Sequence, residues 1–289
     1  MNTARLISMI AFIVFAPFVG GLLDGIDRKL TARMQGRKGP SILQPFYDIS
    51  KLNIKEFLSV NPSQMLMIMS YSFFVILTGA MFYGGFDILL CFFSLSTAAM
   101  FLIMASTSTH TPYTTIGSSR ELMQMMAYEP MVLITAVGLY LAAGSFNVYD
   151  IVTGPVSVIK YLPGIFAGFV FILTIKFRKS PFDLSTSHHA HQEIVKGVTT
   201  EMVGIEYALT IVTEWYENVF LYGVVAIFII NSNPVSWIVA AIVIVLVFFL
   251  EILIDNTSAR VKWQLMLKLA WGVTIVCGGV NLLILNVLH

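Results

Sequence analysis

Charged residues are scarce in this chain, and the scarcity excludes most classes of protein. Asp, Glu, Lys and Arg together make up 11% of the 289 residues, whereas a soluble domain carries about 25%. Hydrophobic residues make up 57%, so the chain is expected to be an integral membrane protein that crosses the bilayer several times. The formal net charge of +1 offers no basis for binding a nucleic acid.

Cysteine is nearly absent, with only Cys91 and Cys277 in the chain. Both lie inside apolar segments and form no C-x-x-C pair, the spacing that many zinc and iron–sulfur sites use. We therefore expect no metal and no redox centre in this chain. Motifs for a nucleophile–base pair, a phosphate loop or a dinucleotide site are also missing, so the chain is not expected to make or break bonds by itself.

Internal repeats and a signal-peptide cleavage site are missing as well. The absence of repeats disfavours transporters that are built from paired halves. Residues 1–23 contain an early Arg5 and then a long apolar run, without the small-residue cleavage site of a signal peptide. We expect this run to be retained as the first membrane helix.

Long apolar runs are abundant. A membrane helix needs about 20 largely apolar residues, and eight segments meet or approach that length. They lie near residues 5–23, 64–84, 86–106, 122–143, 162–177, 206–230, 235–254 and 265–286. The predicted fold class is therefore all-α, a polytopic membrane protein whose residues 1–289 form a single membrane domain.

Basic residues are confined almost entirely to one side of the predicted helices. Of the 17 Lys and Arg residues, only Arg5 and Lys160 fall on the other side. The positive-inside rule places the basic side in the cytoplasm and both termini outside the inner (cytoplasmic) membrane. The predicted cytoplasmic loops are about 24–63, 107–121, 178–205 and 255–264.

The first of these loops contains an amphipathic segment, Gln44 to Leu58. Apolar and charged residues alternate there with the spacing of a helix that lies in the membrane interface, and Pro45 suits its first turn. Two interpretations stay open. The segment is either a surface helix with a solvated charged face or a docking surface for a cytoplasmic partner.

The stretch from Lys176 to Glu217 holds one Asp, five Glu and three His between apolar runs. Ionisable residues near a bilayer are costly and usually functional, so a route for protons or ions is expected here. The histidines His188, His189 and His191 suit proton uptake better than metal binding, because no second ligand cluster is evident. Three further acids lie near predicted helix ends, where interfacial solvation explains them: Asp87, Glu251 and Asp255.

Besides Glu251, four glutamates fall within predicted membrane helices. Glu129 lies near the start of the helix at 122–143 and is followed by Pro130, which frees a backbone carbonyl. On an ideal helix Glu206 and Glu217 are nearly eclipsed, and Glu214 lies about 60° away. The three are therefore predicted to share one stripe, although Glu206 could instead lie in the headgroup region.

Three groups of residues carry a resemblance to a known family. The first comprises Asp27-Arg28-Lys29, Arg37-Lys38-Gly39-Pro40, Leu43-Gln44-Pro45, Asp48, Lys51-Leu52 and Lys55-Glu56. The second runs from Arg120 to Ala127-Tyr128-Glu129, and the third comprises Pro181-Phe182-Asp183, Glu193, Gly197, Glu201, Ala208-Leu209 and Glu214. Together they resemble the H-type (subunit one) membrane protein of respiratory complex I. The likeness is strongest to the membrane-anchor subunit of energy-converting membrane-bound NiFe hydrogenases.

The resemblance implies a subunit that anchors a hydrophilic redox arm and couples electron transfer from ferredoxin to H⁺ or Na⁺ translocation. The NiFe centre and iron–sulfur clusters would belong to the hydrogenase large and small subunits and to iron–sulfur subunits on the cytoplasmic side. An antiporter-like membrane subunit would be a further partner. The implied docking residues for the redox arm are Arg28, Arg37, Gln44, Asp48, Lys51, Lys55 and Glu56.

The predicted ion path combines matches to the family with the residues singled out above. Its members are Glu129, Glu193, Glu201, Glu206, Glu214, Glu217, Asp183, His188, His189, His191 and Arg120. Two of these, His189 and His191, stand where the quinone-reducing branch is rich in glutamate, and the chain is shorter than most members of that branch. Both points favour the hydrogenase branch and disfavour quinone access through the first helices.

Several alternatives stay open at this point. The chain could be the equivalent subunit of a quinone-reducing complex I or of a sulfur-reducing relative. A free-standing ion transporter could use the same carboxylates. A purely structural anchor is disfavoured, because apolar residues would serve an anchor better at the positions of the membrane glutamates.

Overall fold

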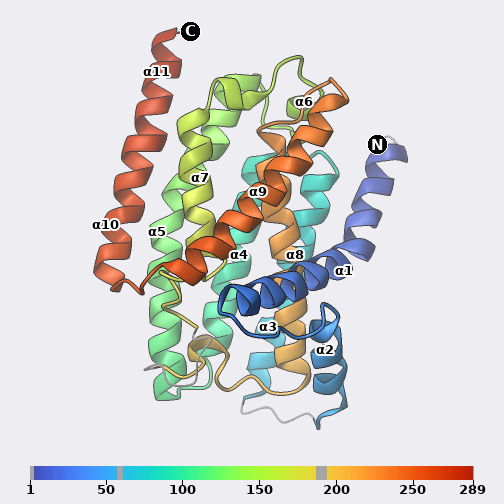
Figure 1. Cartoon of the computed structure of the whole chain (residues 1–289), viewed down its shortest axis with the longest axis vertical. Helices are drawn as coiled ribbons and strands as arrows, with labels where there is room; N and C mark the ends of the chain where they lie inside the picture. The colour runs from blue at the N-terminus through green and yellow to red at the C-terminus, as the bar shows by residue number, and fades with distance from the viewer. Residues whose placement is uncertain (1–2, 57–60, 187–193, 289) are drawn as a thin grey trace.

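The computed structural model describes residues 3–56, 61–186 and 194–288. Every regular element in those ranges is helical (Figure 1), so the predicted all-α class is confirmed. Six helices are long and apolar enough to cross a membrane. They are α1 (Thr3–Met34), α3 (Pro62–Tyr83), α4 (Ile88–Thr107), α5 (Pro112–Ala143), α9 (Val235–Thr257) and the continuous helix Trp263–Val287, which comprises α10 (Trp263–Val273), a π-helical turn (Thr274–Gly279) and most of α11 (Val280–Leu288).

Two more helices complete the bundle. Helix α7 (Pro163–Lys176) is apolar but shorter, and α8 (Ile205–Ile227) is as long as a membrane span but carries three glutamates. Each of the eight predicted segments thus falls on a helix, while the count of eight membrane crossings stays a prediction. Short elements lie between them: α2 (Gln44–Ile54), α6 (Val148–Thr153) and the 3₁₀ turns Val158–Lys160 and Gly197–Thr199.

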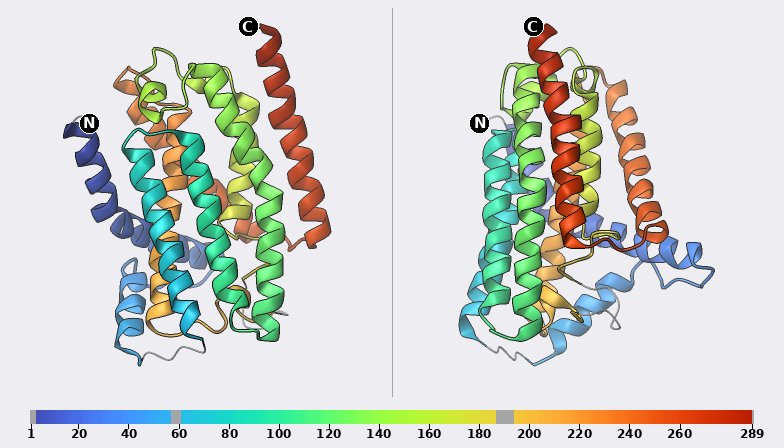
Figure 2. Two further views of the ribbon diagram at one scale, coloured as in Figure 1. Left: turned by 180° about the vertical axis from the view of Figure 1, so that it is seen from behind. Right: turned by 90° about the vertical axis from the view of Figure 1, so that its left-hand side faces the viewer.

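Helix α8 is the most enclosed long helix of the bundle, because α1 and α3 both pack against it. Helices α3, α4 and α5 stand side by side behind it (Figure 2), and α10–α11 runs along α5 and α7 at one edge. In this position most of the surface of α8 is covered by neighbouring helices. Two of the three glutamates of α8, Glu206 and Glu217, are therefore buried inside the protein.

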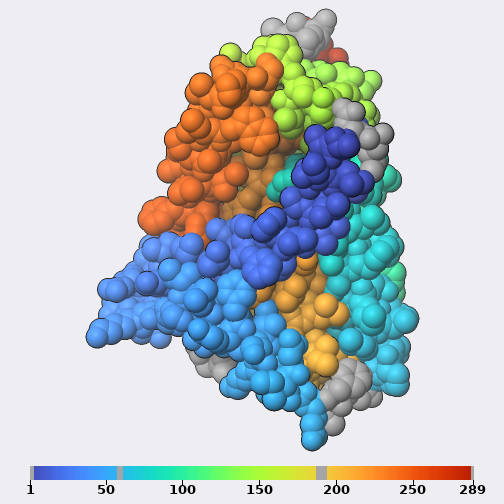
Figure 3. Space-filling model, turned by 90° about the vertical axis from the view of Figure 1, so that its right-hand side faces the viewer, coloured from blue at the N-terminus to red at the C-terminus, as the bar shows by residue number. Residues whose placement is uncertain are grey.

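Helix α1 is longer than expected. It was predicted to end near residue 23, but it continues to Met34 and crosses the outside of the bundle between α9 and α2, as Figure 3 shows. It lies very close to α8, since a Cβ atom on Gly20 would be 2.5 Å from the Cβ of Trp215. Glycine is required there because any side chain would push the two helices apart.

Helix α5 also begins earlier than predicted, at Pro112 instead of near residue 122. Arg120 therefore lies within a helix rather than in a loop, and Glu129 lies near the middle of the helix instead of near its start. Pro112 stands in the first turn, where proline is tolerated because its missing N–H has no helical partner. Pro130 follows Glu129 inside the same helix.

The amphipathic helix of the first loop is confirmed as α2, with Pro45 in its first turn. Its apolar side packs inward, and the ring centroids of Phe46 and Trp215 on α8 are 5.3 Å apart. Lys51 and Lys55 lie exposed on the other side. Residues 57–60, which include the predicted end of the segment at Leu58, lie outside the described ranges.

Replacing Gly20 by Ala tests the close packing of α1 on α8. The added methyl group would meet the backbone and Cβ of Trp215, so we expect a loss of about 1–3 kcal/mol in the free energy of unfolding. Gly272→Ala is the matched control, because a Cβ there meets nothing within 4 Å and Ala favours a helix over Gly by about 1 kcal/mol. Melting curves of the purified chain in detergent should show a lower Tm only for Gly20→Ala.

Candidate functional site

A buried arginine joins two carboxylates at the centre of the molecule. Arg178 follows α7, and its Nη2 lies 2.8 Å from Oε1 of Glu121 on α5. Its Nη1 lies 2.6 Å from Oε1 of Glu214 on α8. Burial alone would lower the pKa of the Arg178 guanidinium, but the two carboxylates hold it well above its ordinary value. The arginine therefore stays cationic, and it links three segments that are distant in the sequence.

A second buried ion pair lies beside the first. Nζ of Lys176, at the end of α7, is 2.7 Å from Oε1 of Glu217, and both side chains are only 10% exposed. The hydroxyl of Tyr71 on α3 donates to the other oxygen of Glu217 at 3.2 Å. Lys176 also donates to the hydroxyl of Tyr128 at 3.1 Å. Each charge is thus compensated by an opposite charge and a hydrogen bond, as buried ion pairs require.

Both ion pairs border a polar cavity of about 140 Å³. Its lining residues include Lys176, Arg178, Lys196, Tyr207, Glu214 and Glu217. A water molecule occupies roughly 30 Å³ of liquid and needs two to four polar partners, so the cavity can hold several waters. The carboxylates of Glu214 and Glu217 therefore border a polar space with room for water.

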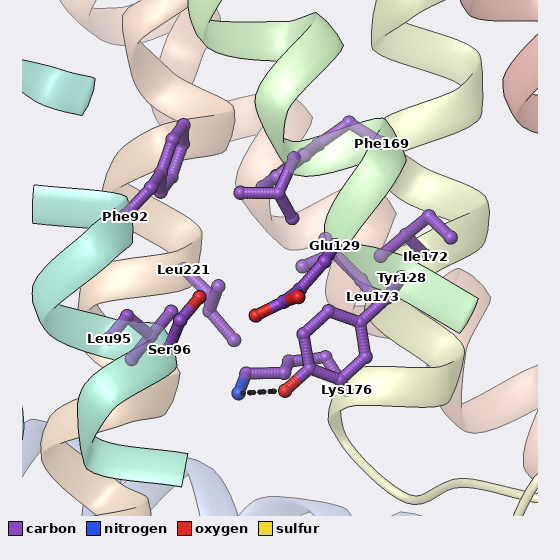
Figure 4. A pocket seen from close by; sticks show the side chains of 11 residues that line it. Phe92, Leu95, Ser96, Tyr128, Glu129, Phe169, Ile172, Leu173, Lys176 and Leu221 are labelled. Atoms are coloured by element: carbon purple, nitrogen blue, oxygen red, sulfur yellow. Dashed lines mark hydrogen bonds between the residues drawn. The ribbon is translucent and has the colours of Figure 1, made fainter. Parts of the chain in front are cut away.

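A smaller cavity of about 20 Å³ lies deeper, between α4, α5 and α7. It is lined by Glu129, Tyr128, Ser96 and Lys176 together with apolar side chains. Figure 4 shows the Glu129 carboxyl pointing into this space. Lys176 lines both cavities, so its side chain borders the space that Glu129 faces and the space that Glu217 faces.

This arrangement is chemically suited to moving protons. Carboxyl groups, a lysine and tyrosine hydroxyls alternate at hydrogen-bonding distance between two spaces with room for water. A change of charge at one group alters the electrostatic energy of protonation at its neighbours, because the site is buried. Ionisable residues placed within a membrane protein in this way typically form ion pathways.

The other acids of the predicted path lie around this cluster. Glu206 is fully buried in the first turn of α8, and its depth in the membrane stays a prediction. Glu201 is half-buried in the turn that precedes α8. Four members of the predicted path lie outside the described residues: Glu193, His188, His189 and His191.

Asp183 and Arg120 bind elsewhere and hold the loop after α7 in place. Asp183 is 2% exposed and lies 2.8 Å from Nε of Arg260, beyond α9. Arg120 on α5 donates to the carbonyl oxygen of Leu184 at 3.4 Å. These contacts tie α5 and the segment after α9 to the loop that carries Arg178.

The predicted docking residues divide into two groups. Arg28 donates to Asp24 at 3.0 Å and to Asp48 at 2.8 Å, and Gln44 donates to Asp48 at 3.2 Å. These residues hold α2 against α1. The remaining ones are exposed and accessible to a partner surface: Arg37, Lys51, Lys55 and Glu56.

Sequence reasoning missed the cations of the cluster and one of its acids. Lys176 and Arg178 were counted only as loop charges, and Glu121 was not singled out. No local signal marked these residues, because the positive-inside rule alone accounts for basic residues at the cytoplasmic end of a membrane helix. Within the described ranges, no group of three or more His, Cys, Asp or Glu residues could hold a metal ion. The histidines at 188, 189 and 191 lie outside those ranges, and the absence of a metal therefore stays a prediction.

Comparison with known proteins identifies the family of this chain. The family model described as NADH dehydrogenase matches residues 7–286. Hydrogenase-4 component C of Escherichia coli is 26% identical over 86% of both chains. Formate hydrogenlyase subunit 4 of the same organism is 26% identical over 91% of this chain and 92% of its own length. An H-type NADH-quinone oxidoreductase subunit of Syntrophobacter fumaroxidans is 27% identical over 92% and 90%.

A solved structure has the same fold over nearly the whole chain. It belongs to the membrane-bound sulfane sulfur reductase, an archaeal respiratory membrane complex, with a TM-score of 0.85 at 21% identity, covering 97% of this chain and 99% of the other. The predicted resemblance is confirmed by the family match, which spans almost every residue. The chain therefore belongs to the NADH dehydrogenase family of H-type subunits, as a multi-pass membrane subunit of complex I-like oxidoreductase complexes.

Proposed function

We propose that this chain is the membrane-anchoring and ion-coupling subunit of a ferredoxin-dependent energy-converting NiFe hydrogenase. Electrons pass between ferredoxin and protons in partner subunits that carry the NiFe centre and the iron–sulfur clusters. Those subunits bind the cytoplasmic side, and an antiporter-like subunit binds within the membrane. The orientation follows from the basic loops, with both termini outside the inner membrane.

The pair of cavities joined by Lys176 carries this proposal. Redox chemistry in the docked arm changes the charge or position of the loop that holds Arg178. The protonation energies of Glu121 and Glu214 change with it, because the two carboxylates share Arg178, and Glu217, paired with Lys176, lines the same cavity as Glu214. Protons then exchange between the large cavity and Glu129, and the change in charge is passed sideways to a partner subunit.

The packing of the first helices favours the hydrogenase branch over the quinone-reducing one. Trp215 fills the contact between α1 and α8 at Gly20, and Phe46 of α2 lies against Gly21. The rings of Phe18, Phe46 and Trp215 form a contiguous aromatic cluster between these helices. This packing supports the view that no quinone enters between α1, α2 and α8.

Two relatives of similar sequence identity are hydrogenase components, but another is an NADH-quinone oxidoreductase subunit. Sequence identity therefore does not choose between the branches.

The decisive experiment is to purify the native complex through this chain, identify the proteins that accompany it, and analyse its content of nickel, iron and quinone. We expect hydrogenase subunits and stoichiometric nickel. Bound quinone without nickel would assign the quinone-reducing branch, and a nickel-free sulfur reductase would assign the sulfur-reducing one.

Neutralising Glu214 should uncouple ion transport from redox turnover. Glu214→Gln removes the carboxylate that Arg178 binds at 2.6 Å, so ion uptake per electron in inside-out vesicles should fall at least about tenfold. Hydrogen turnover with reduced ferredoxin should change little, because the redox centres lie in other subunits. Asp150→Asn, an exposed acid of α6, is the control for charge loss, and normal ion uptake in Glu214→Gln would contradict the proposal.

Reversing the exposed charge of α2 should weaken docking of the redox arm. The double substitution Lys51→Glu with Lys55→Glu leaves the buried side of α2 unaltered, so the membrane chain should fold normally. We expect at least about a tenfold loss of affinity for the hydrophilic subunits, with a weaker dependence on salt. Lys160→Glu, exposed and on the predicted outer side, is the matched control, and equal recovery of the hydrophilic subunits with wild type, control and double variant would contradict docking at α2.

A further inference from the structure

A second group of charges surrounds Lys179, the residue that directly follows the central arginine. Lys179 forms an ion pair with Asp27 on α1 and lies 3.7 Å from Oδ2 of Asp255 on α9. Burial alone would lower the pKa of the Lys179 amino group, but the carboxylates of Asp27 and Asp255 raise it above its ordinary value. Asp255 also accepts a hydrogen bond from the Ser180 amide at 2.9 Å. The loop after α7 thus carries two cations that bind different acids. Arg178 binds Glu121 and Glu214, and Lys179 binds Asp27 and Asp255.

Glu251 belongs to the second group but has a different environment. It lies one helical turn before Asp255 on the same face of α9, and it is 1% exposed. Neither of its carboxyl oxygens has a hydrogen-bond partner among the residues the structure describes. The proposed ion path does not use it, and its sequence position near a helix end predicted solvation at the membrane interface, which the burial contradicts.

The charged and titratable groups near Glu251 come from α9 itself, from α8, from α1 and from the loop after α7. Lys179 and Asp255 interact with it electrostatically, as does Tyr222 on α8. Asp27 on α1 adds a further carboxylate beside Lys179 and Tyr222. Lys179 is the cation that the described residues supply to this group, and it is already shared by two aspartates, so it cannot compensate a third negative charge.

A buried carboxylate without donors is strongly disfavoured, whereas a neutral carboxylic acid tolerates the same place. From this geometry we propose that Glu251 is a second proton-binding site, separate from the cluster around Arg178. It holds its proton on α9 at about pH 7. Its ligand is H⁺, because no group of three or more acidic, histidine or cysteine side chains within the described ranges is placed to hold a metal cation.

Asp255 connects this site to water. Its side chain is 22% exposed, and it lies about 6 Å along the helix axis from Glu251, a distance that one water can bridge. A proton from the cytoplasmic side binds the Asp255 carboxylate and passes to Glu251, and the reverse transfer returns it. Because Lys179 and Arg178 are adjacent, a movement of their loop alters the charge next to both proton sites.

Infrared spectroscopy of the purified full-length chain tests the site without any redox partner. Wild-type protein at about pH 7 should show a protonated-carboxyl band that shifts in D₂O. Glu251→Gln should abolish the band, while Glu214→Gln should retain it. Glu251→Asp keeps a carboxyl group and should move the band rather than remove it. A band of wild-type size and position in both Glu251 variants would overturn the proposal.

The rate of hydrogen–deuterium exchange of that band tests the connection to water. Asp255→Asn should slow the exchange by at least about tenfold, whereas Asp150→Asn should leave it unchanged. Asp255→Asn still accepts from the Ser180 amide through its side-chain oxygen, so the loop should keep its place. Unaltered exchange in Asp255→Asn would rule out Asp255 as the route. Since these measurements involve neither hydrogenase activity nor ion transport, their failure would leave the function proposed above untouched.

Discussion

The ion pairs of Arg178 with Glu121 and Glu214 constrain most of the interior. A buried cation shared by two carboxylates is stable only when every partner is in place, and removal of one member of such a pair costs about 3–5 kcal/mol. Arg178 therefore fixes α5, α8 and the loop after α7 relative to one another. That fixed loop in turn sets the end of α7, where Lys176 stands between two cavities.

Much of this architecture could be predicted from hydropathy and helical geometry. Every apolar run of membrane length forms a helix, and the amphipathic period of the first loop identified α2. The helical spacing also placed Glu214 and Glu217 on one stripe, and both line the same polar cavity. These features depend on local sequence and on burial of one face, which is why a single sequence is enough to derive them.

The partners of those glutamates could not be predicted, because they depend on long-range packing. Arg178 is 57 residues from Glu121 in the sequence, and no local pattern connects the two. Glu251 was expected at the membrane interface because it lies close to the end of α9. It is buried on a helix against which α1, α7 and α8 all pack, and these long-range contacts leave no local pattern in the sequence.

The continuity of α1 has a mechanical consequence. Two consecutive residues of the helix make these contacts: Asp27 binds Lys179, and Arg28 binds Asp48 on α2. Neighbouring residues on a rigid helix cannot shift independently, so a displacement of α2 is transmitted to the loop after α7 as a movement of one lever. A movement of α2 is therefore coupled mechanically to the groups around Arg178 and Lys179. Force applied at the cytoplasmic face reaches these groups through the backbone of α1, without passing through any side chain of the cavities.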